Sequence, residues 1–176
     1  MIRAVCLDFG DTLADETTEI KDSRGVTLRA ELLPDAADVI RELNTRGYPL
    51  ALVADGFSET YANVLAQHGI DDCFAVVSAS EQAGAEKPSA PVFVRALEAL
   101  GIEPGEYRMT VMVGNRLDRD IRGSRALGMI SVLLTAANRN RSQPSDEGDT
   151  PDHAIARLAE LPALLDQIER ELQGSR

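Results

Sequence analysis

The chain has 176 residues, of which 44% are hydrophobic, 27% are charged and 4% are aromatic. This composition is typical of one soluble globular domain with an aliphatic core, here expected over 1–176, and it excludes a disordered or fibrous protein. The 29 acidic residues outnumber the 18 basic ones, which gives a formal charge of −11. This charge argues against general nucleic-acid binding, because the phosphate backbone is also negative.

The first ten residues, MIRAVCLDFG, contain an apolar run that Asp8 interrupts too early for a secretory signal. Since no apolar run approaches the length of a membrane span, we expect no membrane association and a cytoplasmic protein. Cys6 and Cys73 lie in apolar stretches without a CxxC pattern. We therefore expect two buried thiols rather than a disulfide, a metal pair or a nucleophile.

Short apolar runs alternate with amphipathic stretches along the chain. The runs predict β-strands over 2–7, 49–54, 74–77, 110–113, 130–134 and 154–155. Helices are expected to begin near Asp35, Ser58, Ala90 and Leu117, and a last one covers about 158–172. Because the runs are continuously apolar, as in strands buried on both faces, they predict an α/β fold with a Rossmann-like parallel sheet of five or six strands in three layers.

Two segments lack a clear period. Segment 14–33 is polar and has room only for a short insertion, such as a small hairpin or flap, so we expect no large cap. Segment 136–151 follows the fifth strand and should emerge on the active-site side of the sheet as an irregular loop. There Arg139 and Arg141 are either substrate contacts or part of a solvent-exposed linker.

Ligands of open parallel sheets bind outside the carboxyl ends of the strands, so the residues that follow each run matter most. These are DFGDTL, ADG, SASEQAGAEKP and GNRLDRD. In this order and at these distances, the residues around Asp8, Lys87 and Asp120 resemble the motifs of the haloacid dehalogenase-like superfamily. The resemblance runs from Ile2 to about Leu134 and includes the helix and strand segments EKPSAPVFVRALEALGI and DIRGSRALGMISVLL.

The resemblance implies that Asp8 is a nucleophile that forms an aspartyl-phosphate, and that the Lys87 ammonium offsets the repulsion between the two anions. It also implies a Mg²⁺ site. Its ligands would be Asp8, Asp120, the carbonyl of Gly10 and the side chain of Asn115. From the residues alone, Lys87 could instead be a solvated loop lysine, and Asp120 an acid of the first helical turn paired with an arginine.

Three positions depart from the family pattern. Gly10 replaces the acid that usually protonates the leaving group, and Asp11 could take this role only if the loop turns differently. Ala54 replaces a Thr or Ser that binds a phosphoryl oxygen, which leaves the backbone of Asp55 and Gly56 as donors. Asn115 replaces an Asp and removes a charge from the metal site. Arg116 is expected either to bind the substrate anion or to form a salt bridge.

The leading hypothesis is therefore a Mg²⁺-dependent hydrolase that acts on a phosphorylated substrate, small or macromolecular, through Asp8. A rival is a domain that binds a phosphorylated ligand or a protein without turnover. A third hypothesis is halide displacement, which needs neither metal nor leaving-group acid. Because a capless site is open to water and to large substrates, we expect either a macromolecular or bulky phosphorylated substrate, or closure by a second copy in a homo-oligomer.

Overall fold

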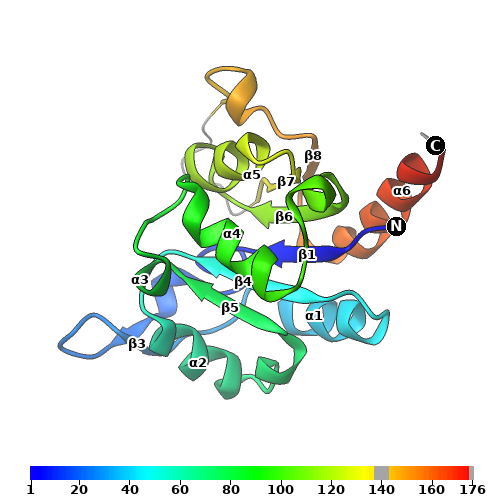
Figure 1. Ribbon diagram of the computed structural model, residues 1–176. Coiled ribbons are helices and arrows are strands. Elements are labelled where there is room, and N and C mark those ends of the chain that lie inside the picture. The colour runs from blue at the N-terminus through cyan, green and yellow to red at the C-terminus, as the bar shows by residue number, and fades with distance from the viewer. Residues whose placement is uncertain (137–142, 175–176) are drawn as a thin grey trace.

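The computed structural model describes residues 1–136 and 143–174. Its centre is a parallel sheet with strand order β5-β4-β1-β6-β7-β8, and Figure 1 shows these strands side by side. The strands are β1 (Ala4–Leu7), β4 (Leu50–Ala54), β5 (Val76–Ala79), β6 (Thr110–Gly114), β7 (Ile130–Leu134) and β8 (His153–Ile155). The predicted α/β class and the six-stranded parallel sheet are confirmed.

Helices follow the strands as expected. The α-helices are α1 (Ala36–Thr45), α2 (Ser58–Gln67), α3 (Ser80–Ala83), α4 (Ala90–Ala99), α5 (Arg122–Ala126) and α6 (Leu161–Gly174). Shorter 3-10 turns are η1 (Glu16–Thr18), η2 (Asp71–Cys73), η3 (Pro104–Met109), η5 (Glu147–Asp149) and η6 (Leu158–Glu160). In the described parts of the chain, none of the helices has the length and apolar character needed to cross a membrane.

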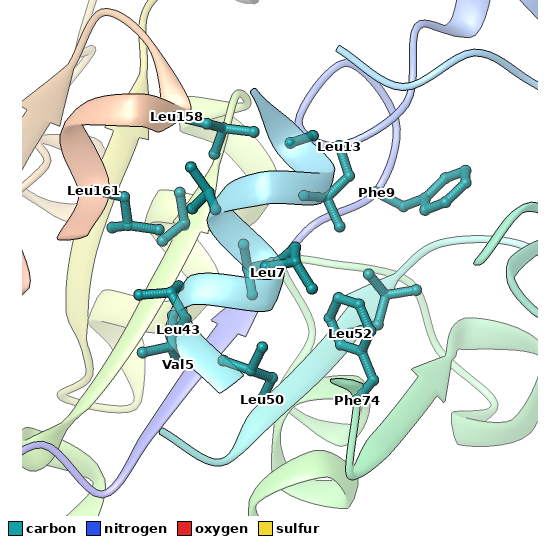
Figure 2. Packing of buried hydrophobic residues seen from close by; sticks show 14 of the residues in the cluster. Val5, Leu7, Phe9, Leu13, Leu43, Leu50, Leu52, Phe74, Leu158 and Leu161 are labelled. Atoms are coloured by element: carbon teal, nitrogen blue, oxygen red, sulfur yellow. The ribbon is translucent and has the colours of Figure 1, made fainter. Parts of the chain in front are cut away.

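Alternate residues of β1, β4 and β6 feed two cores on opposite faces of the sheet. Val5 and Leu7 of β1 pack with α1, α2 and α6, while Ala4 and Cys6 pack with α4. Figure 2 shows the first core, where Leu43 lies close to Leu50 and Val5. The helices thus cover both faces, which completes the three layers. Both cysteines are buried and free, as predicted.

One predicted boundary was wrong, and one helix begins where expected but in another form. The strand expected over 74–77 lies at Val76–Ala79, because Phe74 ends the η2 turn and is buried in the core on the α1 side. The helix expected from Leu117 begins as a π-helical turn, η4 (Leu117–Ile121), and becomes α-helical only at Arg122. Such π turns are rare in proteins, and those that occur are often found at functional sites.

The fully described stretch between β1 and α1 holds η1 and a hairpin of β2 (Ile20–Lys21) and β3 (Thr27–Arg29), which extends from the sheet in Figure 1. The hairpin rests on α2, where Thr27 N–H donates to Thr60 Oγ1 at 2.9 Å. The sequence predicted this short insertion. We refer to residues 10–29 as the flap.

The second irregular segment is anchored where it is described. Asp149 accepts a hydrogen bond from Arg122 of α5, and Asp152 accepts one from Ser131 N of β7. Arg139 and Arg141 lie outside the described residues. Residues 143–151 are therefore held against the body of the protein by polar contacts, and none of these nine described residues lines the cavity discussed next.

Candidate active site

A cavity of about 600 Å³ opens at the carboxyl ends of β1, β4 and β6, with the flap on its other side. The ten residues that the sequence singled out all line it. They are Asp8, Gly10, Asp11, Ala54, Asp55, Gly56, Lys87, Asn115, Arg116 and Asp120. Segments that are far apart in the sequence thus converge where the strand-end rule for parallel sheets predicts.

Asp8, Lys87 and Asp120 form a buried ion cluster at the base of the cavity. Lys87 Nζ donates to Asp8 Oδ1 at 2.6 Å, to Asp120 Oδ1 at 2.7 Å and to the Val53 carbonyl at 3.0 Å. The register explains the meeting, because Leu7 pairs with Leu52 of β4 and with Val113 of β6, so Asp8 leaves the sheet between them. Lys87 is 5% exposed, which excludes the solvated loop lysine.

The charges in this cluster do not balance. Burial acts to lower the pKa of Lys87, but the charges and hydrogen bonds of Asp120 and Asp8 outweigh it and raise the pKa above its ordinary value. Lys87 is therefore a cation. Burial, followed by the charge of Asp8, raises the pKa of Asp120, and Lys87 opposes this effect. With both carboxylates ionised, the cluster carries one net negative charge, which favours an additional cation.

Asp120 is held by the π turn. Its Oδ2 accepts a hydrogen bond from Arg116 N at 3.0 Å, while the Arg116 guanidinium pairs with Asp118. A Cβ on Gly114 would overlap the Asp120 carboxyl, so glycine at the end of β6 makes room for this side chain. Of the two expectations for Arg116, the salt bridge is therefore the one formed, although the residue lines the cavity.

Asp55 organises the loop that carries Lys87. Its Oδ1 accepts from Lys87 N at 2.9 Å and its Oδ2 from Arg119 at 2.9 Å. Gly56 has a φ of 137°, which favours glycine, and its N–H donates to Ser80 Oγ at 2.9 Å. The Gly56 N–H that we expected to face the substrate anion is thus already bonded to a side chain.

The loop after Asp8 turns sharply toward the flap. Leu13 N and Ala14 N both donate to the Phe9 carbonyl, and Thr12 Oγ1 donates to Asp8 Oδ2 at 3.1 Å. Asp11 has a φ of 51°, a left-handed conformation that aspartate tolerates, and its Oδ1 accepts from Glu16 N at 3.1 Å. The Asp11 carboxylate therefore holds the start of η1.

Sequence reasoning missed several cavity residues. Thr12, Glu16, Lys21, Tyr61 and Arg119 either line the cavity or contact Asp8. Glu16 is the most unusual, because burial and the nearby charges of Asp11, Glu19 and Asp8 raise the pKa of its carboxyl. Its only sequence signal was an acid in a polar segment shortly after Asp8, which is too common a pattern to identify a site.

The residues fit a hard divalent cation. The candidate ligands Asp8, Asp120, Asn115 and the Gly10 carbonyl offer oxygen atoms, which Mg²⁺ prefers. Each oxygen of the two carboxylates accepts one hydrogen bond here, and an ionised carboxylate has about four acceptor positions, so both retain room for a metal. Within residues 1–136 and 143–174, no group of three or more His, Cys, Asp or Glu side chains is arranged for a metal, so the candidate ligand set includes the neutral oxygens of Asn115 and Gly10.

Comparison with known proteins agrees with this geometry. The family model of haloacid dehalogenase-like hydrolases matches residues 10–128, more than half of the chain. The chain belongs to this family.

The chain is similar to phosphatases of known structure or curated function. It is 33% identical to the glyceraldehyde 3-phosphate phosphatase of Methanopyrus kandleri, over 78% of this chain and 58% of that protein. It is 32% identical to the phosphoserine phosphatase of Thermus thermophilus, over 76% of this chain and 51% of that protein. The crystal structure of a HAD phosphatase from Thermococcus onnurineus superposes with a TM-score of 0.65 at 32% identity, over 77% and 59% of the two chains. The chain thus spans little more than half the length of these relatives.

Proposed function

We propose that this protein is a Mg²⁺-dependent phosphatase that acts through an aspartyl-phosphate on Asp8. The observation that carries the proposal is the buried cluster in which Lys87 bonds both Asp8 and Asp120, at 2.6 and 2.7 Å. The phosphatase relatives support the proposal. About a third of the aligned residues are identical between this chain and each of them, and the Thermococcus onnurineus structure also shares the fold.

The chemistry follows from the placement of charge. Asp8 attacks the phosphorus atom of a phosphorylated substrate, and Lys87 neutralises part of the negative charge that the two groups bring together. Asp55 positions Lys87 by accepting a hydrogen bond from the Lys87 backbone N–H. When bound by Asp8, Asp120, Asn115 and the Gly10 carbonyl, Mg²⁺ would supply further charge neutralisation at the phosphoryl oxygens.

The substrate that we propose is a small phosphorylated compound, because the cavity measures about 600 Å³ and the named relatives act on small phosphate esters. Halide displacement is the weaker alternative, since it needs no metal, whereas the buried cluster carries a net negative charge that favours a cation. The cytoplasmic location, the single domain over 1–176 and closure by a second copy remain predictions.

The test is a panel of alkyl, aryl and acyl phosphates, with 2-haloacids added, assayed with Mg²⁺ or with EDTA. We expect phosphate release that needs Mg²⁺ and that falls by more than about 10³-fold in Asp8→Asn, because an amide is not a competent nucleophile. Asp38→Asn is the control, since its side chain is 91% exposed on α1.

Three outcomes would contradict the proposal. Turnover that survives in Asp8→Asn would exclude the covalent mechanism. Halide release without metal would favour dehalogenation. A chain that is inert on the whole panel, but binds a phosphorylated compound in a Lys87-dependent way, would be a binding protein.

A further inference from the structure

The carboxylate of Glu16 occupies the space that a side chain at residue 10 would fill. A Cβ built on Gly10 would overlap Glu16 Oε1 and would lie 2.9 Å from Cδ and 3.1 Å from Cγ of the same residue. The backbone at Gly10 does not have a positive φ, so its conformation does not demand glycine. What a side chain at residue 10 would meet is the Glu16 carboxylate, which is the end of a flexible side chain.

This placement is built by the flap. Glu16 begins η1, its N–H donates to Asp11 Oδ1 at 3.1 Å, and Asp15 caps the turn by accepting from Thr17 N at 2.9 Å. Although much of the Glu16 residue is exposed, its carboxylate reaches the cavity that Asp8 and Gly10 also line. The chain therefore has an acid beside Gly10, two residues from the nucleophile, supplied from outside the strand-end motif.

We propose that Glu16 is the proton donor and acceptor of the phosphatase reaction, in the place left by the missing acid at residue 10. The proposal rests on the proposed function. Asp11, the other candidate for this role, is then a positioning residue, because its carboxylate binds the Glu16 backbone.

The proton balance is as follows. Asp8 Oδ forms a bond to phosphorus, the bond between phosphorus and the leaving oxygen breaks, and that oxygen takes the proton of the Glu16 carboxylic acid. In the second step a water molecule attacks phosphorus and gives a proton to the Glu16 carboxylate. The bond between phosphorus and Asp8 breaks, which releases inorganic phosphate and restores both groups.

The experiment compares Glu16→Gln with the unaltered chain on substrates that differ in leaving group. An alkyl phosphate needs a proton on its leaving oxygen, so its turnover should fall by about 10²-fold or more. With p-nitrophenyl phosphate the first step needs little acid, whereas the second still needs a base. Rapid quenching should then show a burst of one equivalent of p-nitrophenolate, with phosphorylated Asp8 accumulating in the intact-mass spectrum.

Glu19→Gln is the matched control. It removes a negative charge from the same wall of the cavity, but Glu19 bonds Thr27 and Lys21 and does not occupy the space beside Gly10. Its turnover should stay within a few-fold of the unaltered chain. Equal losses in the two variants would mean that the net charge of the flap matters and would overturn the assignment to Glu16.

A second pair of variants moves the acid. Glu16→Ala should lose turnover of the alkyl phosphate, and Gly10→Asp in the Glu16→Ala background should restore a large part of it, because the space is then open to the new side chain. If Glu16→Gln keeps full activity, shows no burst and does not depend on the leaving group, the role of Glu16 is overturned. The proposed phosphatase function would still hold in that case. An unaltered chain that releases no phosphate from any substrate would instead overturn the proposed function.

Discussion

The two walls of the cavity are built in different ways. One wall comes from the ends of β1, β4 and β6, where Asp8, Lys87 and Asp120 are buried and Lys87 bonds both carboxylates. The other wall is the flap, where Glu16 lies on an exposed three-residue turn and its carboxylate lines the cavity. Charge on the strand-end wall is therefore tied to the stability of the fold, whereas charge on the flap wall can change with little effect on folding.

The largest expected effect tests the strand-end wall. Lys87→Met should abolish turnover and should also lower the free energy of unfolding by about 3–5 kcal/mol, because it leaves two buried carboxylates without their cation. Urea denaturation followed by circular dichroism measures the loss.

The control for Lys87 is Arg119→Met, which breaks the partly exposed ion pair with Asp55 and should cost less than about 1 kcal/mol. If Lys87→Met unfolds at the same urea concentration as Arg119→Met, the buried cluster does not support the fold and the contrast between the walls disappears.

The next effect tests the flap wall. Gly10→Ala should fold normally, because the end of the Glu16 side chain is flexible and can move away from the new methyl group. Turnover of alkyl phosphates should fall by about 10²-fold, as for a lost acid–base group, and Gly10→Ala combined with Glu16→Gln should lose little more.

Gly105→Ala serves as the control for Gly10, because no atom lies near its added Cβ. Its folding and its turnover of alkyl phosphates should both be unchanged. A fully active Gly10→Ala variant would show that the position of the Glu16 carboxylate beside residue 10 is irrelevant to turnover.

The same contrast explains what the sequence predicted. Asp8, Lys87 and Asp120 follow buried strands or their loops, and parallel strands bring their carboxyl ends to one edge whatever lies between them. Glu16 reaches the site through a local turn that depends on the left-handed backbone of Asp11 and on the Asp15 cap. No periodicity encodes such a turn. The roles of Asp11 and Arg116 were left open by the sequence for the same reason, since both depend on which backbone or side-chain partner lies within reach.

The smallest effect concerns a region outside both walls. Asp149 accepts hydrogen bonds from Ser145 Oγ, Ser145 N, Asp146 N and Arg122, and these bonds hold its pKa at about 2. Because the folded pKa lies below the ordinary value of about 3.9, ionised Asp149 stabilises the fold above that value. This contribution is lost as the pH falls through the folded pKa.

Asp149→Asn should therefore lower the unfolding temperature at neutral pH without changing turnover, and the difference from the unaltered chain should narrow as the pH falls from about 4 to about 2. Calorimetry across this range measures the difference, in which groups common to both chains cancel. Glu147→Gln, on the same turn but exposed, should show no such narrowing. A change in turnover of Asp149→Asn would mean that residues 143–151 also act on the active site. The strand-end wall and the flap would then not account for turnover by themselves.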